Sequence, residues 1–343
     1  MDKKIYLTVD VECHDYNKIN QYIYGNTKKG VYGLERILLL GKELDVPINI
    51  FLDVPECHVY GDKYIHDIVN LINNYNQPIF LHVHPDYILD PKRKHLWEYT
   101  QDEQKIIIEQ ALEDYQRLCG KFERLVFRAG AWGVNADTYE VLSELRSEHK
   151  NVEIIDLSYV YKSRWRCHLS FAEFGAANAS KYYKNVIVFP NTTYIGFDYF
   201  GKQYPFELCV PNPSYQEFKD IIDNSTLNSI TYTMHSWDFI KRWFFIPGFI
   251  AGNKRQIRIF RKCVKYAREK GYEFSDLRHY QLREEEDESI NLCSGIIGKI
   301  KCLWYNYIRF ADIGRSFKKY SGLYFMPMVL VGVSILLVLI EIL

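Results

Sequence analysis

Two histidines separated by one residue follow an apolar run in the segment PIFLHVHPDY, residues 78–87. On a β-strand, residues i and i+2 point to the same side. His82 and His84 would therefore present two imidazoles together where a strand ends. The segment IYLTVDVE ends in the same way, with Asp10 and Glu12 two residues apart. These four side chains are candidate metal ligands and acid–base groups.

Further polar residues end other apolar runs. Arg128 follows LVF, Asp156 follows EII, and His235 follows ITYTM, with Trp237 and Asp238 just beyond. In parallel α/β architectures the active site lies at the carboxyl ends of the strands. The sequence therefore predicts that these residues converge at one mouth with the acidic and histidine pairs.

This set of residue types predicts hydrolysis of an amide. Histidine and carboxylate ligands with one open position are what a catalytic zinc requires, and such a metal activates water near neutral pH. A second carboxylate can accept the proton of that water, and a histidine on the other side can protonate a leaving amine. Backbone N–H groups in the Gly-containing turn RAGAWG can stabilise an oxyanion.

The sequence pattern around these residues predicts an α/β domain that positions them. Apolar, β-branched runs predict strands that begin near residues 5, 48, 79, 125, 152, 186, 230 and 272. Helical spacing of apolar residues recurs over 108–119 and 257–267. Strands that alternate with helices favour βα units and a parallel sheet. Seven or eight such units within residues 1–283 predict a barrel-like domain.

Composition narrows the functional class. The 343-residue chain has 43 Lys and Arg against 43 Asp and Glu, so its net charge of zero argues against a nucleic-acid partner. The eight cysteines form no C-x-x-C pair and are expected to be free thiols in a reducing compartment. The amino-terminal residues enter the first strand without a signal-peptide pattern.

The carboxyl-terminal segment is apolar. Residues 323–343 contain one charge, Glu341, and are long enough to cross a bilayer. Arg315, Lys318 and Lys319 precede this segment. We expect a single transmembrane helix at 323–343 with the large domain on the cytoplasmic side, because positive charge stays on that side.

Residues 284–322 connect the domain to this segment. The acidic run 284–288 predicts a solvated linker. Ile296, Ile300 and Leu303 then recur at helical spacing, together with nearby lysines. This pattern favours an amphipathic helix on a membrane surface, the alternative being a helix packed back on the domain.

Four motifs, in this order, resemble the polysaccharide deacetylase superfamily, carbohydrate esterase family four, also called the NodB-homology domain. They are TVDVE (8–12), HVHPD (82–86), FRAGAWG (127–133) and TMHSW (233–237). The resemblance runs from about residue 4 to 282. It implies a distorted (β/α)7–8 barrel, one divalent metal, often zinc, and removal of an acyl group from an N-acylated amino sugar.

By position, the resemblance also implies a role for each residue. The implied roles are catalytic base for Asp10, metal ligand for Glu12 and His82, orientation of Asp10 for Arg128, oxyanion contact for the Ala131 N–H, and catalytic acid for His235. Trp132 and Trp237 are expected beside the substrate.

The sequence departs from the commonest family motifs, and two assignments stay open. The third metal ligand is His84 or Asp86, and the same-face argument favours His84. The carboxylate that tunes His235 is Asp156 or Asp238. The first motif carries Val11 between its two acids, and the third motif lacks the usual proline.

The leading hypothesis is a membrane-anchored deacylase that acts on a polyprenyl-linked amino sugar, with acetyl as the favoured acyl group and Zn²⁺ as the favoured metal. One alternative is a catalytically silent, membrane-tethered sugar-binding or scaffold protein in glycan assembly. Another is an exported polymer deacetylase.

Overall fold

The computed structural model describes residues 3–148, 152–163, 166–199, 201–210, 212–242, 250–283 and 286–316. Within these ranges, no helix is both long and apolar enough to span a bilayer. The transmembrane helix expected at 323–343 lies outside the described residues, so it stays a prediction.

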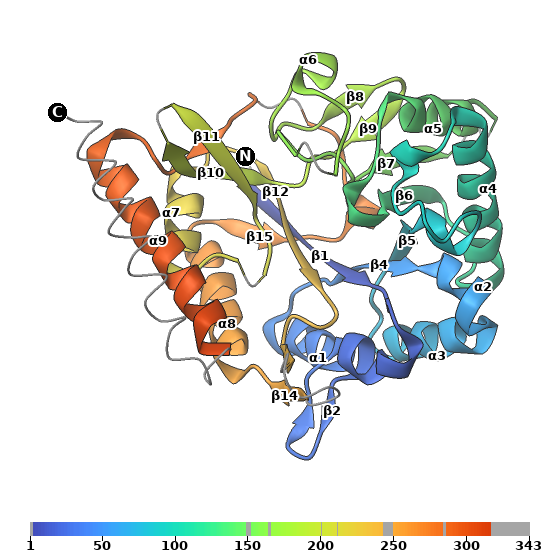
Figure 1. Cartoon of the computed structure of the whole chain (residues 1–343), viewed down its shortest axis with the longest axis horizontal. Helices are drawn as coiled ribbons and strands as arrows, with labels where there is room; N and C mark the ends of the chain where they lie inside the picture. Colours follow the sequence, from blue (N-terminus) through green and yellow to red (C-terminus); the bar gives the residue numbers. More distant parts are fainter. Residues whose placement is uncertain are drawn as a thin grey trace.

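A largely parallel sheet forms the centre of the domain (Figure 1). Its strands follow the order β12-β1-β4-β5-β6-β7-β9-β8, and β15 also pairs with β1. They span β1 (Lys3–Val11), β4 (Asn49–Asp53), β5 (Ile79–Val83), β6 (Arg124–Ala129), β7 (Glu153–Asp156), β8 (Lys181–Tyr183), β9 (Val186–Val188), β12 (Ser229–His235) and β15 (Tyr272–Phe274). Among the described strands of this sheet, only β8 pairs in antiparallel orientation. The eight strands expected from the sequence are all present, and their carboxyl ends share one edge.

The sheet is curled, with a different apolar layer on each side. In β1, Ile5, Leu7 and Val9 contribute to the large core under the helices, whereas Tyr6 joins a smaller cluster with Phe51 of β4. This alternation places the even-numbered residues of β1 on the concave side. Asp10 and Glu12 therefore point to the inside of the curl.

Curling brings the two ends of the sheet together without a continuous ladder in the described part of the chain. The segment after β9 meets β12, where the Thr192 and Thr231 backbone N–H groups each donate to the other residue's hydroxyl. The barrel-like α/β domain expected from the sequence is thus observed as an incompletely closed, half-barrel sheet.

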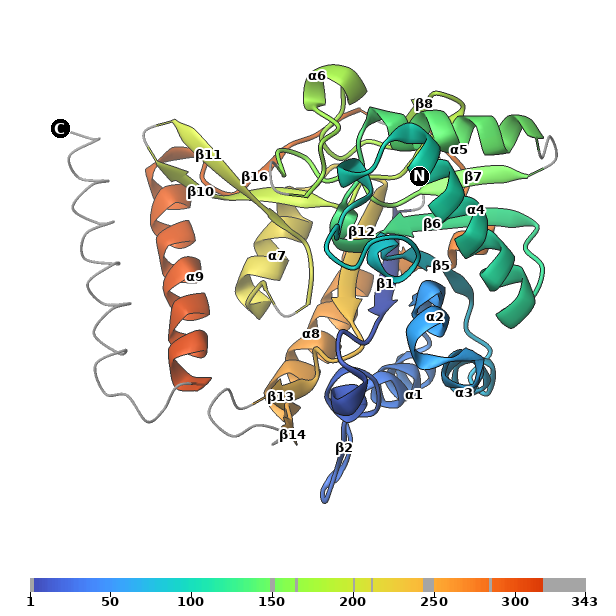
Figure 2. The same ribbon diagram turned by 45° about the vertical axis from the view of Figure 1, so that its right-hand side comes forward.

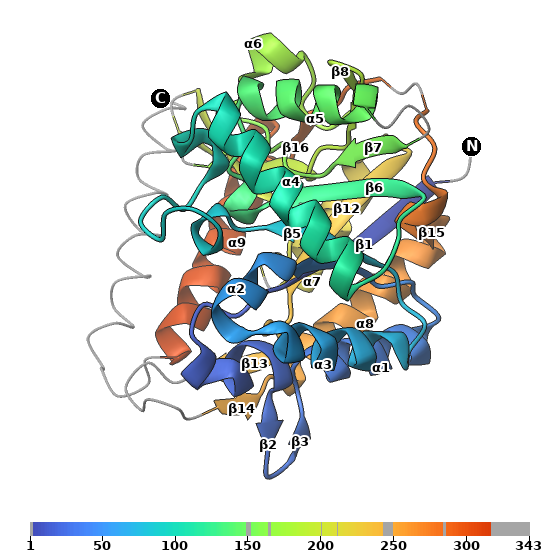
Figure 3. The same cartoon turned by 90° about the vertical axis from the view of Figure 1, so that its right-hand side faces the viewer.

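Helices cover the convex side of the sheet, with α4 and α5 turned toward the viewer in Figure 3. The α-helices span α1 (Leu34–Leu44), α2 (Cys57–Tyr60), α3 (Asp62–Asn73), α4 (Gln101–Leu118), α5 (Ala136–Glu148), α6 (Phe171–Phe174), α7 (Tyr215–Asn224), α8 (Lys254–Glu269) and α9 (Gly295–Ser316). The 3-10 helices are η1 (Tyr16–Lys18), η3 (Val54–Glu56), η4 (Pro85–Tyr87), η5 (Leu96–Glu98), η6 (Gly130–Trp132) and η7 (Leu277–His279), and η2 (Asn20–Tyr24) is a π-helix. The remaining short strands are β2 (Asn26–Thr27), β3 (Gly30–Val31), β13 (Ile240–Arg242) and β14 (Ile250–Gly252).

A small second sheet joins the carboxyl-terminal region to the domain. The hairpin of β10 (Thr193–Tyr199) and β11 (Lys202–Glu207) pairs with β16 (Ile290–Asn291). Asp287 accepts hydrogen bonds from the backbone N–H groups of residues 177–179, and Glu288 accepts one from the N–H of Thr226. Asp287 is nevertheless exposed, so this part of the acidic run contacts both solvent and backbone donors of the domain.

Candidate active site

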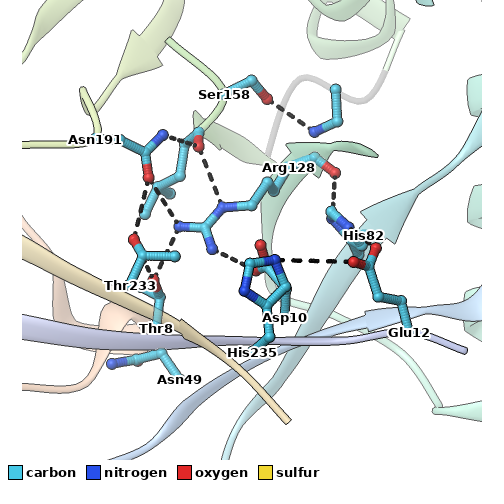
Figure 4. Close-up of polar contacts among 12 residues, drawn as sticks. Thr8, Asp10, Glu12, Asn49, His82, Arg128, Ser158, Asn191, Thr233 and His235 are labelled. Carbon is cyan, nitrogen blue, oxygen red and sulfur yellow. Dashed lines mark hydrogen bonds and ion pairs between the residues drawn. The ribbon is translucent and has the colours of Figure 1, made fainter. Parts of the chain in front are cut away.

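Strand register brings the predicted residues to one mouth of the curled sheet (Figure 4). Asp10 on β1 is opposite His235 on β12, and His82 on β5 is opposite Arg128 on β6. Because neighbouring parallel strands end together, side chains from four strands meet although they span more than 220 positions of the sequence.

Three of these side chains form a buried cluster of metal-ligand type. The Glu12 Oε2 atom lies 2.5 Å from His84 Nε2 and 3.2 Å from His82 Nε2. One donor atom from each residue lies within 4.8 Å of the other two. The His82 Nδ1 atom is 3.1 Å from the carbonyl oxygen of Arg128. A proton on Nδ1 would be donated to this carbonyl, and the lone pair of Nε2 would then be available to bind a metal. A carboxylate and two oriented imidazoles fit a divalent metal such as zinc.

The geometry favours His84 over Asp86 as the third ligand. An Asp86 oxygen lies 3.9 Å from His84 Nδ1, on the side of the ring away from Glu12, and the other oxygen lies 2.5 Å from Lys94 Nζ. Asp86 therefore lies beyond the far side of the His84 ring and outside the cluster with Glu12 and His82.

Gly130 allows the His84 ring to take this position. A Cβ atom at residue 130 would lie 2.5 Å from His84 Cγ and Nδ1. Real Cβ atoms do not approach other atoms so closely, so the close packing of turn and ring requires glycine here.

The cluster has a strong internal charge pairing. Burial raises the pKa of Glu12, but the charge of His84 and hydrogen bonds from His14, His82 and His84 outweigh it and hold this pKa well below the usual range. Burial lowers the pKa of His84, yet the nearby Glu12 carboxylate raises it to about 10. The pair therefore carries a proton that a divalent metal must displace when it binds.

Arg128 fixes the predicted base, Asp10. The guanidinium is fully buried and its Nη1 donates to Asp10 Oδ1 at 2.5 Å. Its Nε donates to the Leu157 carbonyl at 3.2 Å, and its Nη2 donates to the Thr8 hydroxyl at 3.0 Å. Because these partners hold the guanidinium in place, its charged hydrogen bond fixes the orientation of the Asp10 carboxylate.

Asn191 and Thr233 complete this network, although sequence reasoning missed both. The Asn191 Nδ2 donates to the Leu157 carbonyl at 2.7 Å, which turns its Oδ1 toward Arg128 Nη2 at 3.4 Å and the Thr233 hydroxyl at 3.3 Å. Asn191 directly follows the apolar run VIVFP. The strand-end criterion that selected Asp10 and His82 would therefore have found it.

His235 lies across the mouth from Arg128 and is the more exposed of the two. Its Nε2 is 3.8 Å from Glu12 Oε1, and its ring stacks on Trp237 with centroids 4.6 Å apart. Asp238 accepts a hydrogen bond from the His235 backbone N–H at 2.8 Å and has Oδ2 4.0 Å from Nδ1. Trp237 is half-buried, so it can meet a substrate beside His235.

Asp156, one of the two carboxylates expected beside His235, contacts other side chains instead. Its carboxylate accepts hydrogen bonds from the Tyr139 hydroxyl at 2.8 Å and the Ser158 hydroxyl at 2.5 Å. Ser158 in turn accepts from the Ala129 N–H. In the described part of the chain, Asp156 and His235 share no hydrogen bond or ion pair. The geometry thus favours Asp238 as the partner of His235 and makes Asp156 a support for the strand that carries Arg128.

The turn after β6 has a strained backbone. Ala131 and Trp132 have φ values of 49° and 55°, a left-handed conformation that side chains disfavour. Such strain is concentrated at functional sites. The Ala131 N–H lies in the first turn of η6, where a backbone donor has no partner within its helix. Trp132 is buried under the Arg166 guanidinium, 4.9 Å from its ring, so it offers little surface to a substrate.

Comparison with known proteins gives similarity at the level of structure only. No family model and no curated protein matches the sequence. Among solved structures, the chain is similar to a protein from Mycobacterium smegmatis provisionally assigned as a polysaccharide deacetylase, with 14% identity, a TM-score of 0.48 and coverage of 81% of this chain and 88% of the other. It is also similar to a polysaccharide deacetylase from Bacillus cereus (15%, 0.39, 85% and 98%) and to a chitin deacetylase from Colletotrichum lindemuthianum (12%, 0.39, 79% and 84%).

Proposed function

We propose that this protein is a metal-dependent hydrolase that removes an N-acyl group, with acetyl favoured, from an amino sugar. One observation carries the proposal: the buried Glu12–His82–His84 cluster lies beside the Asp10–Arg128 pair and opposite His235. One divalent metal, with Zn²⁺ favoured, is the proposed cofactor.

The residues of the chain divide the chemistry between them. Glu12, His82 and His84 would hold the metal, which would supply Lewis-acid chemistry for activating water and polarising the amide carbonyl. Asp10, oriented by Arg128, accepts the proton of the attacking water. His235 donates a proton to the leaving amine.

The backbone turn after β6 contributes to charge stabilisation. The Ala131 N–H donates to the oxyanion that forms on the amide carbonyl. Trp237 packs beside His235 and lines the path of the substrate.

The proposed substrate is a polyprenyl-linked glycan precursor at the cytoplasmic membrane face. The apolar segment 323–343 and the basic residues before it support membrane attachment with this orientation. An enzyme held at that face meets a lipid-linked sugar more readily than a finished extracellular polymer.

The test measures metal content and acetate release on the same purified samples, with polyprenyl-diphosphate N-acetylglucosamine as the substrate. We expect about one metal per chain and release of acetate in the wild type. Both should be lost in His82→Ala and kept in His279→Ala, which removes an exposed histidine of η7.

Other outcomes redirect the proposal. Metal without acetate release would favour another acyl sugar or the catalytically silent scaffold. A wild-type protein that binds no metal would refute the proposed site. Protease access to the domain in intact cells, compared with opened vesicles, distinguishes the cytoplasmic enzyme from an exported polymer deacetylase.

A further inference from the structure

Helix α9 presents an apolar face to solvent. Ile296, Ile297, Ile300 and Trp304 are 53%, 74%, 56% and 57% exposed. At about 100° per residue, these four positions fall within an arc of roughly 100° on one side of the helix. Tyr307 extends this face, because its ring stacks on Trp304 with centroids 5.4 Å apart. A contiguous exposed apolar face of this kind marks an interaction surface.

The opposite side of α9 is anchored to the domain, so the apolar face is held outward. Cys302, Leu303 and Tyr305 are buried. The Tyr305 hydroxyl donates to Asp220 at 2.6 Å, and the Asn306 side chain donates to the Gly196 carbonyl of β10 at 3.1 Å. Figure 2 shows α9 at the outer edge of the domain, beyond α7 and below the β10–β11 hairpin.

We infer that this face of α9 lies in the headgroup region of a lipid bilayer. Only six residues, 317–322, separate α9 from the apolar segment 323–343. Six residues span at most about 20 Å, so a bilayer that holds this segment lies within reach of the helix. The inference rests on the proposed membrane attachment but not on the deacylation chemistry.

The composition of the region fits a lipid surface better than a protein partner. Trp and Tyr side chains are favoured at the interface between acyl chains and water. Arg315, Lys318 and Lys319 follow or end the helix, and basic residues are attracted to anionic headgroups. Exposed isoleucines beside such residues are typical of helices that lie in the plane of a membrane.

Depth-dependent fluorescence quenching tests the inference on the full chain. The protein is reconstituted into vesicles of phosphatidylcholine and phosphatidylglycerol whose acyl chains carry bromine near the headgroup. We expect a part of the tryptophan fluorescence to be quenched in the wild type and this part to be lost in Trp304→Phe. Adding Ile297→Trp to that variant should restore it.

A matched control separates lipid contact from general exposure. Ile106 on α4 is 53% exposed, the same as Ile296, but belongs to another part of the surface. Adding Ile106→Trp to Trp304→Phe should restore no quenching. Equal quenching with and without Trp304, or equal restoration from positions 106 and 297, would overturn the inference. A third outcome would also overturn it. If Trp304 is not quenched and the protein forms dimers that Ile297→Asp dissociates, this face binds a second copy of the chain. The experiment measures no turnover, so its result can be interpreted even if the protein proves not to be a deacylase.

Discussion

Replacing Gly130 by alanine tests whether His84 is a metal ligand. The added Cβ would meet His84 Cγ and Nδ1 at 2.5 Å, whereas non-bonded carbon atoms prefer about 3.5 Å. The imidazole must therefore move by about 1 Å. Metal–ligand distances tolerate only about 0.2 Å, so His84 would leave the coordination shell. We expect metal affinity to fall by at least about 10- to 100-fold, the range for damage to groups that orient ligands.

Competition with a chromophoric chelator measures the affinity at fixed pH, and circular dichroism reports whether the variant is folded. Gly196→Ala is the matched control. Gly196 is on β10, and its added Cβ would lie 2.8 Å from the Phe206 ring on β11, so the substitution introduces similar crowding away from the mouth. A folded Gly130→Ala protein with wild-type affinity would refute His84 as a ligand and turn attention to Asp86.

Three further predictions concern the surrounding network. Asp10→Asn should reduce turnover by about 10²- to 10⁴-fold with metal content unchanged, because a general base is lost; retained turnover would remove Asp10 from the mechanism. Thr233→Val removes a hydrogen bond beside Arg128 and should lower kcat about five- to tenfold with KM unchanged, whereas Thr231→Val, on the same strand, should affect only thermal stability. Burial raises the pKa of Asp156 from 3.8 to about 6, so the contribution of this group to the free energy of unfolding should fall by about 3 kcal/mol as pH rises between these values. Urea unfolding at both ends of this range should show this fall as a change in the stability difference between wild type and Asp156→Asn, and parallel pH profiles of the two proteins would contradict the assignment.

The positions of the strands along the chain could be predicted because each strand is a short apolar, β-branched run. The period of two also placed Glu12, His82 and His84 on shared sides of their strands, and the structure brings these side chains together. The partner of Asp156 could not be predicted in this way. A strand-end position does not reveal whether a carboxylate faces the mouth or, as here, the Tyr139 hydroxyl.

Other features gave weaker signals in the sequence. Thr8 and Thr233 look like ordinary strand formers, and their hydroxyl–hydroxyl contact at 3.1 Å depends on the pairing of β1 with β12. The amphipathic pattern of residues 296–310 did not reveal which apolar residues face the domain. Leu303 is buried against it, whereas Ile300 faces outward, because contact with β10 and Asp220 sets the rotation of α9.

The position of β1 between β4 and β12 has a consequence for synthesis of the chain. This strand pairs with β4 on one side and with β12 on the other, so its second edge has to wait for residues 229–235. About 220 residues separate Val11 from that partner, which takes the ribosome roughly 10 to 45 s at 5–20 residues per second. During this interval Asp10 and Glu12 have only one neighbouring strand, and the nascent protein exposes an unpaired edge that can bind other chains. The site that contains His235 can therefore form only late in translation. Slower translation of the middle third of the chain would lengthen the period in which the nascent chain needs a chaperone.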